Sequence, residues 1–410
     1  MMNSIRPAKK QLEFLDWELG VFFHFGIRTF YEGHIDWDGK PMALEGFNPT
    51  ELDCEQWIRT VYEGGGKYAI LVCKHHDGFA NWPSKYTEYS VKNTPWKNGK
   101  GDVVREFVDA CRKYGIKVGL YYSPAQFGSK EMNPAEYDDY FINQISELLT
   151  NYGTIDYLWF DGCGSEGHKY DEKRIVSEIR RLQPDILIFN MWDPDTRWVG
   201  NECGFAQMPN VNVVNELDFS VMTEEKDSLE NAAFLPVECD FKIRRSWFYS
   251  DADKPTLKSL DELMGNYLYT VGRGANMLLN IAPDRSGKLP ATDAQRFIEL
   301  GRTVKAKYGN PLVRVENPEC SGDSFAVRLE EPTLIDSVEL TEDITNCEKA
   351  QSVRIYIRQH SRGMPIFVAS AESIGHRLIL TFPPATCSEV VFEIKGRDGM
   401  KITSASVFAH

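Results

Sequence analysis

Polar side chains follow four short apolar runs of the sequence, near the point where each run ends. His24 interrupts FFHFG, His75 and His76 follow YAILVCK, Tyr121 lies in VGLYY, and Asp161 ends LWFD. In a parallel α/β barrel the carboxyl ends of the strands meet at one face, and catalytic groups lie there. If these runs are strands of such a barrel, their polar ends converge on one pocket.

The carboxylate of Asp161 is the group best placed for catalysis. It ends an apolar run and precedes Gly162, which allows a tight exit from a strand. Asp-Gly is also common in turns, so position alone favours a catalytic role and a turn role equally. Hydrolysis of a glycoside needs a second carboxyl group. The main candidates are Glu202 in RWVGNECG and Glu238 in LPVECDF, ahead of Glu216 and Glu166, although an arbitrary glutamate is more often an exposed loop residue.

The histidines raise a metal-dependent hydrolase as an alternative. Adjacent residues on a strand point to opposite faces, so His75 and His76 are not expected to chelate one ion together. The sequence has no HExxH or HxH spacing, and its nine cysteines form no CxxC pair. Hydrogen bonding to the hydroxyl groups of a sugar uses the same side chains. We therefore predict no metal and no cofactor; stoichiometric metal and inactivation by a chelator would contradict this.

Short apolar runs alternate with longer amphipathic segments over the first three quarters of the chain. The expected strands are 20–27, 68–74, 117–123, 157–162, 186–191 and 276–281, and helices are expected near 102–114, 135–151, 171–182, 259–271 and 291–306. This alternation is typical of a parallel α/β fold, and the length favours a (β/α)8-like barrel over a doubly wound sheet. No GxGxxG follows the first expected strand, and the pattern GxxxxGK[ST] is absent from the sequence, so nucleotide-binding folds lose their main support.

The pattern changes at about residue 309, near Asn310-Pro311. The segments that follow are short, rich in Val, Ile, Phe and Thr, and separated by Pro, Gly, Asn and Asp, which is typical of an all-β domain. We predict a catalytic barrel over residues 1–308 and a β-sandwich over 309–410. No tryptophan lies beyond Trp247, so we expect the sandwich to brace the barrel rather than to bind carbohydrate.

Composition narrows the class of partner. The net charge of −14 argues against binding to nucleic acid or to an anionic membrane, both of which need clustered Lys and Arg. An aromatic content of 12% suits a neutral ligand with apolar faces, although core packing could use the same rings. The cysteines are odd in number and scattered, no apolar stretch is long enough for a membrane span, and the opening segment lacks the apolar region of a signal peptide. We therefore expect a cytoplasmic protein with reduced thiols.

Several motifs together resemble one enzyme family, the family 29 glycoside hydrolases, or α-L-fucosidases. They are HFG at 24–26, the long block from KYAILVCKHHDGFANWP to KVGLYYSP at 67–124, LWFDG at 158–162, RWVGNE at 197–202, ECDFKIRRSWFY at 238–249 and VGRGANMLLNIAPDRSG at 271–287. TEDIT at 341–345 and ESIGHR at 372–377 extend the resemblance into the β region. The later motifs look like the subgroup that acts on α-1,3- and α-1,4-linked branch fucose of Lewis-type glycans.

The resemblance implies a retaining exo-α-L-fucosidase that acts on fucosylated oligosaccharides or glycoconjugates. Asp161 would be the nucleophile and Glu202 the acid/base, with Glu238 as the runner-up for the second role. The remaining residues implied by the resemblance would bind the sugar: His24, Asp36, Trp37, His75, His76, Tyr121, Trp159 and Trp247.

The chain also departs from the family pattern. Relatives usually have Arg-Glu-Trp where this chain has Ile35-Asp36-Trp37, and they often have Trp-Asp where Ala125-Gln126 follow Tyr-Ser-Pro. Arg245-Ser246-Trp247 replaces the usual Arg-Pro-Gly-Trp. These positions shape the aglycone side, so a related activity on another sugar or linkage is one alternative. A catalytically silent fucose-binding protein is another, but it would be expected to lack one of the two carboxyl groups.

Overall fold

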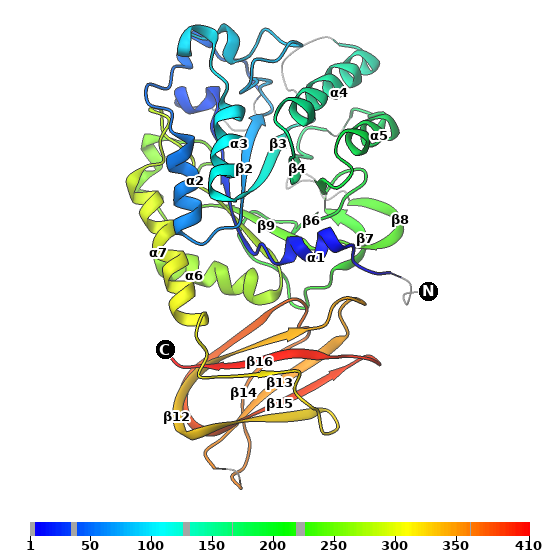
Figure 1. The fold of residues 1–410 in the computed structure, drawn as a ribbon, viewed down its shortest axis with the longest axis vertical. Helices are drawn as coiled ribbons and strands as arrows, with labels where there is room; N and C mark the ends of the chain where they lie inside the picture. The colour runs from blue at the N-terminus through cyan, green and yellow to red at the C-terminus, as the bar shows by residue number, and fades with distance from the viewer. Residues whose placement is uncertain (1–4, 34–38, 126–131, 166, 219–225, 361) are drawn as a thin grey trace.

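The computed structural model describes residues 5–33, 39–125, 132–165, 167–218, 226–360 and 362–410. Figure 1 shows a barrel of strands surrounded by helices, with a β-sheet domain packed against one end of it. The barrel comprises the first three quarters of the chain, and the sheet domain begins after the last helix. This arrangement agrees with the predicted fold class.

Eight parallel strands form the barrel sheet in the order β5-β4-β3-β2-β1-β10-β9-β6. A further parallel bridge between Phe189 and Thr196 brings the two edges of this sheet nearly to closure. The strands are β1 (Leu19–Phe23), β2 (Tyr68–Lys74), β3 (Lys117–Tyr122), β4 (Tyr157–Phe160), β5 (Leu187–Phe189), β6 (Arg197–Trp198), β9 (Val237–Lys242) and β10 (Asn276–Asn280).

The surrounding helices begin at polar caps. Asp53, Asp102, Asn133, Asp171 and Ser259 each accept a hydrogen bond from a backbone N–H in the first turn of a helix, which satisfies a donor that has no partner within the helix. The helices are α1 (Lys9–Leu15), α2 (Cys54–Glu63), α3 (Val103–Tyr114), α4 (Pro134–Asn151), α5 (Glu172–Leu182), α6 (Leu260–Tyr269) and α7 (Ala291–Tyr308). Short 3-10 helices occupy Ile27–Phe30, Leu44–Gly46, Val91–Asn93, Trp96–Gly99, Asp251–Thr256 and Val271–Arg273. No helix among the described residues is long and apolar enough to cross a membrane.

Most of the expected strands are present, but two boundaries differ in a way that matters for the site. The first strand was predicted to run to Ile27, whereas β1 ends at Phe23 and Ile27 starts a 3-10 turn. The fourth was predicted to run to Gly162, whereas β4 ends at Phe160. His24 and Asp161 therefore lie just beyond their strands, where their side chains are free of the alternation between the two faces of a sheet.

Strand β9 was not predicted, because its sequence alternates polar and apolar residues instead of forming an apolar run. Its polar side chains are nevertheless largely buried: Glu238 and Asp240 are 1% and 4% exposed. Glu238 accepts hydrogen bonds from Tyr68 Oη at 2.7 Å and Trp159 Nε1 at 2.8 Å, and Asp240 accepts one from Trp198 Nε1 at 2.6 Å. These donors allow carboxyl groups to occupy the inside of the barrel.

Helix α1 covers the end of the barrel at which the strands begin. Phe14 and Trp17 pack with Tyr68 and Tyr157, the first residues of β2 and β4. The backbone oxygen of Phe14 also accepts a hydrogen bond from Asn276 at the start of β10. The opposite end of the barrel, where the strands finish, is the end at which the predicted site residues lie.

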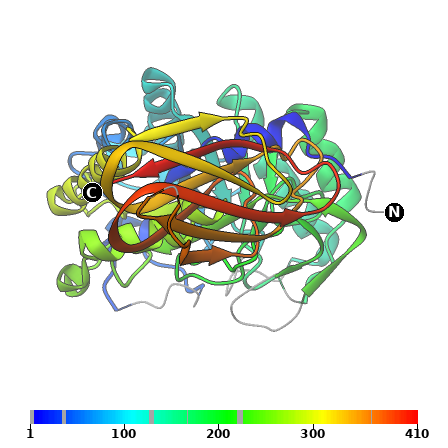
Figure 2. The same ribbon diagram turned by 90° about the horizontal axis from the view of Figure 1, so that it is seen from below.

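Six antiparallel strands form the C-terminal domain, in the order β11-β16-β12-β15-β13-β14. Bulges divide the long strands β12 and β15, so that one part of β12 pairs with β16 while another part of β15 pairs with β13. Apolar residues of both parts belong to one core, and Figure 2 shows the strands crossing over one another. The strands are β11 (Val313–Glu316), β12 (Ser324–Glu342), β13 (Ala350–Arg358), β14 (Ile366–Ala371), β15 (Leu378–Gly396) and β16 (Ile402–Phe408). A separate hairpin, β7 (Val213–Asp218) with β8 (Lys226–Phe234), lies beside the barrel.

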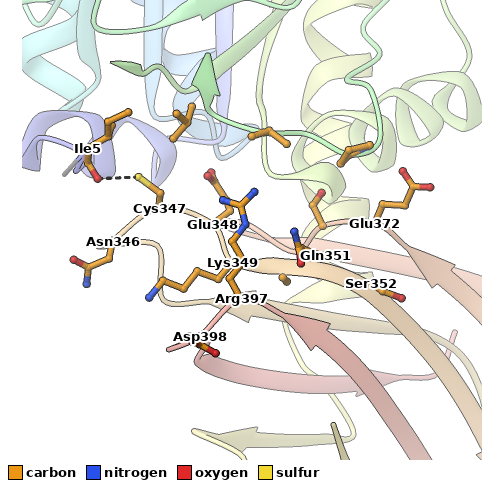
Figure 3. A pocket seen from close by; sticks show the side chains of 15 residues that line it. Ile5, Asn346, Cys347, Glu348, Lys349, Gln351, Ser352, Glu372, Arg397 and Asp398 are labelled. Atoms are coloured by element: carbon orange, nitrogen blue, oxygen red, sulfur yellow. Dashed lines mark hydrogen bonds between the residues drawn. The ribbon is translucent and has the colours of Figure 1, made fainter. Parts of the chain in front are cut away.

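The C-terminal sheet contacts the barrel at the end where the strands begin. Arg377 donates to both carboxylate oxygens of Glu18, each at 2.9 Å, and also pairs with Glu339 at 2.6 Å. Because Glu18 directly precedes β1, this network ties the sheet to the barrel at the far end from the predicted site. A cavity of about 770 Å³ lies along the same junction, where Cys347 Sγ contacts the backbone oxygen of Ile5 at 3.3 Å (Figure 3).

The buried Glu238 generates a prediction about stability and pH. Burial raises the pKa of Glu238 to about 7, and hydrogen bonds from Tyr68, Trp159 and Tyr157 offset only part of that effect. Between pH 4.5 and 7 the folded protein therefore holds a proton that the unfolded chain has released. Stability is lost as the pH rises through this window. Glu238→Gln, which resembles the protonated carboxyl, should remove this loss, worth on the order of 3 kcal/mol for a shift of this size.

Urea unfolding at pH 5 and pH 8 measures the effect. We expect the free energy of unfolding of Glu238→Gln, relative to the natural protein, to increase between the two pH values. Glu238→Leu is the matched control: it also removes the titration, but it leaves Trp159 Nε1 and Tyr68 Oη without an acceptor. Relative to Glu238→Gln, it should be destabilised by roughly 1–3 kcal/mol for each such group at both pH values. Parallel pH dependences for the natural protein and Glu238→Gln would contradict this account.

Candidate active site

The structure brings Asp161 together with side chains from neighbouring strand ends. Its Oδ2 atom accepts a hydrogen bond from Tyr121 Oη at 2.8 Å, and its Oδ1 atom accepts one from the backbone N–H of Cys163 at 2.9 Å. His76 Nε2 lies 3.6 Å from the same Oδ2 atom. Three consecutive barrel strands, β2, β3 and β4, thus contribute to one cluster.

The carboxyl group of Asp161 is held as an acceptor by neutral donors. Its side chain is 26% exposed, and burial raises its pKa, an effect that the Cys163 N–H and the Tyr121 hydroxyl oppose. Burial together with the negative charge of Asp161 also raises the pKa of Tyr121, so this hydroxyl remains a donor. The result is a carboxylate with fixed oxygens and, among the described residues, no cation in direct contact, which leaves its charge available to a substrate.

The histidines gather beside this carboxylate. Ring centroids of His24 and His75 are 5.8 Å apart, and those of His75 and His76 are 4.3 Å apart. Burial lowers the pKa of all three, to about 3 for His24 and His76. The rings are therefore neutral at physiological pH, and each offers one N–H donor and one nitrogen acceptor.

The expectation that His75 and His76 point to opposite faces of a strand is wrong. Strand β2 ends at Lys74, so both histidines lie in the turn that follows it and escape the alternation of a strand. Ligand atoms of His75, His76 and Asp161 all lie within 4.8 Å of one another. Neutral imidazoles and a carboxylate can ligate a metal, and the same groups can equally receive and donate hydrogen bonds to a sugar.

A buried lysine supports the turn that carries these histidines. Lys74, the last residue of β2, is fully buried, and its Nζ donates to the backbone oxygens of Ser123 at 2.8 Å and Ala125 at 3.2 Å. Ser123 Oγ lies 2.6 Å from His76 Nδ1. The ends of β2 and β3 are thus joined by polar contacts as well as by the sheet.

Aromatic rings form the walls around the histidines. Trp247 lies 4.8 Å from His24, and Phe248 lies 5.3 Å from His24 and 5.1 Å from His75, edge to face. Tyr121 stacks on Trp159 at 5.4 Å, and the Trp159 ring in turn stacks on Phe189 at 4.1 Å. The Trp159 ring thus packs against both Tyr121 and Phe189, and its indole N–H is bonded to Glu238.

The two candidate glutamates occupy different surroundings. Glu202, in the loop after β6, is 31% exposed and accepts a hydrogen bond from Lys242 Nζ at 2.6 Å. The same ammonium lies 4.5 Å from the centre of the Trp247 ring, and Trp247 contacts His24. Glu202 therefore lies near the aromatic rings that surround the histidines. Glu238 lies in the barrel interior, bonded to Tyr68 and Tyr157, whose strands begin there.

Sequence reasoning missed several residues of this cluster, and two predicted residues cannot be placed. Asp36 and Trp37 lie outside the described residues. The missed residues are Lys74, Ser123, Lys242 and Asn280, whose Oδ1 atom lies 2.8 Å from His24 Nδ1. A signal for Asn280 was present, because it ends the apolar run NMLLN just as Asp161 follows YLWF.

The arrangement suits displacement at a neutral, hydroxylated substrate. A fixed carboxylate can attack an electrophilic carbon, neutral histidines and a tyrosine can bind hydroxyl groups, and aromatic faces can cover C–H surfaces. Glu202 is an accessible second carboxyl group. These are the components that hydrolysis of a glycosidic bond requires.

Comparison with known proteins gives consistent matches. A family model described as Alpha-L-fucosidase matches residues 2–309. The protein named Alpha-L-fucosidase 1 from Arabidopsis thaliana is 36% identical over 323 residues, which cover 75% of this chain and 62% of that protein. A relative from Oryza sativa subsp. japonica is matched over 59% of its own length. The chain thus spans about three fifths of these plant relatives.

Solved structures agree with the sequence matches. A glycoside hydrolase 29 family member from an unknown rumen bacterium is 33% identical and superimposes with a TM-score of 0.88, covering 98% of this chain and 77% of that one. The structure of SpGH29 is 29% identical with a TM-score of 0.89, and 98% of each chain is covered. Together with the family model, these matches show that the chain belongs to the alpha-L-fucosidase family, glycoside hydrolase family 29.

Proposed function

We propose that the protein is a retaining exo-α-L-fucosidase that releases terminal fucose from oligosaccharides. The observation that carries the proposal is the carboxylate of Asp161, fixed by Tyr121 and Cys163 beside neutral histidines within a fold of this family. In such a site a carboxylate can act as a nucleophile because neutral hydrogen-bond donors fix its oxygens without removing its charge.

The proposed reaction has two displacements. An oxygen of Asp161 bonds to the anomeric carbon of fucose while the bond from that carbon to the aglycone oxygen breaks, and Glu202 gives its proton to the departing oxygen. Water then attacks the same carbon. Glu202 takes a proton from this water, the ester bond to Asp161 breaks, and fucose is released with its original anomeric configuration.

We assign the acid/base role to Glu202 rather than Glu238. Lys242 contacts Oε2 of Glu202, which leaves Oε1 for proton transfer. Glu238 accepts bonds from Tyr68, Tyr157 and Trp159 in the barrel interior, where a leaving group has no access to it. Glu238 instead supports the position of Trp159.

Fucose would bind among His24, His75, His76 and Tyr121, whose polar atoms match its ring hydroxyls. The rings of Trp159 and Trp247 offer apolar surface, which suits the methyl group that distinguishes fucose from galactose. We extend the proposal to α-1,3- and α-1,4-linked branch fucose on the strength of the motifs at 197–202, 238–249 and 341–345.

We further propose that the enzyme works in a reducing compartment, as a cytoplasmic enzyme acting on imported oligosaccharides would. All nine cysteines are free thiols, as is expected where the compartment keeps thiols reduced, and five of them are buried within the fold.

Mass-detected release of fucose tests the function and its linkage. We expect release from a Lewis-type trisaccharide, and Asp161→Ala should lower the rate by at least ~10³-fold because the nucleophile is lost. The matched control is Asp156→Ala at the other end of β4, where the carboxylate bonds to Val118 N and not to the site. This control should keep its rate within a few fold.

The other outcomes separate the alternatives. Cleavage of an aryl α-L-fucoside alone would keep the fucosidase and contradict the linkage. Binding of fucose without cleavage of either substrate would favour a silent binding protein. Full activity of a folded Asp161→Ala protein would contradict the nucleophile assignment.

Rescue by azide tests the second carboxyl group. In Glu202→Ala the departing oxygen lacks its acid and the water lacks its base, so hydrolysis of an activated aryl fucoside should stall after the first displacement. Azide is a nucleophile that needs no base, so it should restore turnover and yield fucosyl azide of retained configuration. Rescue of Glu238→Ala, and not of Glu202→Ala, would reverse the assignment.

A further inference from the structure

The hydrogen bonds around His24 fix which of its ring nitrogens carries the proton. His24 Nδ1 lies 2.8 Å from Oδ1 of Asn280, at the end of β10. The amide of Asn280 has only one consistent orientation, because its Nδ2 atom lies 2.8 Å from the backbone oxygen of Trp247, which can only accept. The Oδ1 atom is therefore the acceptor that faces His24, and Nδ1 of His24 must be the donor.

A neutral ring then leaves Nε2 without a proton. Burial lowers the pKa of His24 to about 3; the hydrogen bond to Asn280 opposes this effect, and the positive charge of Lys242 adds to it. One proton on the ring, held at Nδ1, makes Nε2 an acceptor. Within the described part of the chain, Nε2 of His24 makes no hydrogen bond, while the ring itself lies beside Trp247.

We propose that Asn280 is a positioning residue that locks His24 in the Nδ1-protonated form, so that the pocket requires a hydroxyl group which donates to His24 Nε2. The inference rests on the proposed function in naming fucose as the ligand. The inference makes the proposed function more specific: binding requires a sugar hydroxyl that donates a hydrogen bond to His24 Nε2, and a group that only accepts is not sufficient. Asn280 also positions Trp247, because its Nδ2 atom donates a hydrogen bond to the backbone oxygen of Trp247.

The protonation state can be measured without any sugar. In protein labelled with ¹⁵N-histidine, the nitrogen resonances distinguish protonated from unprotonated ring nitrogens, and His24→Gln identifies the signals of His24 among the eight histidines. We expect Nδ1 protonated and Nε2 unprotonated. In Asn280→Leu, which has a similar shape and no acceptor, the proton should be shared between the two nitrogens.

A matched control lies on the same strand. Asn276 is also a buried asparagine of β10, but its Nδ2 donates a hydrogen bond to the backbone oxygen of Phe14. This contact lies at the closed end of the barrel, the end that helix α1 covers. Asn276→Leu should therefore leave the signals of His24 unchanged. A protonated Nε2 in the natural protein, or unchanged His24 signals in Asn280→Leu, would overturn the inference.

Calorimetry with L-fucose and its monodeoxy and monodeoxyfluoro analogues tests the consequence. Fluorine can weakly accept a hydrogen bond but cannot donate one. At the position that faces His24, fluorine should weaken binding as much as removal of the hydroxyl, by about 10-fold for one hydrogen bond. In Asn280→Leu the fluoro analogue should bind better than the deoxy analogue at that position.

The outcomes distinguish this inference from the function on which it rests. Fluoro analogues that bind better than deoxy analogues at every position of the natural protein would overturn the inference and leave fucosidase activity intact. Absence of fucose binding and of hydrolysis would instead overturn the function, and with it the identity of the donor that His24 requires. In that case the resonances alone would still report on the role of Asn280.

Discussion

The structure of the site depends on keeping one partly buried carboxylate charged. Asp161 has no cation in direct contact among the described residues, and burial opposes its ionisation. Two neutral donors, the Tyr121 hydroxyl and the Cys163 N–H, hold one oxygen each and offset part of that cost. A salt bridge would stabilise the charge further, but it would also weaken the carboxylate as a nucleophile.

Polar and aromatic side chains inside the barrel support Tyr121, the residue that donates to Asp161. Tyr121 is stacked on Trp159, Trp159 is anchored by its indole N–H to Glu238, and Glu238 is held by Tyr68 and Tyr157 at the closed end. The contacts therefore run from helix α1 through the barrel to the nucleophile. The C-terminal sheet is tied to the same closed end through Arg377 and Glu18, far from the open end where substrate would enter.

The sequence predicted those parts of the fold whose local pattern matches their burial. Strands β2 and β10 are buried on both faces and read as apolar runs, and helices α3 to α7 appear near their expected positions. Strand β9 could not be found in this way, because its Glu238, Asp240 and Lys242 are polar and are stabilised by partners from other strands and from the loop after β6. Whether a polar residue is buried depends on contacts with distant parts of the chain. The pattern of polar and apolar residues along the sequence does not show such contacts.

The site itself was predicted from residues at strand ends, and this rule placed Asp161, Tyr121 and the three histidines in one cluster. The rule did not predict the individual contacts between these side chains. The contact between His75 and His76 depends on β2 ending one residue before them, and strand ends are the least certain part of any prediction from sequence. Asn280 and Ser123 were missed because their roles lie in orienting a histidine that comes from another strand.

The central claim is that Asp161 forms the covalent bond to the sugar. Incubation with 2-deoxy-2-fluoro-α-L-fucosyl fluoride tests it most directly, because the 2-fluoro group slows the second displacement and lets the intermediate accumulate. Intact mass followed by peptide mapping should show one fluorofucosyl group per chain, attached to Asp161. Attachment to any other residue, or continued turnover with no labelled protein, would contradict the account.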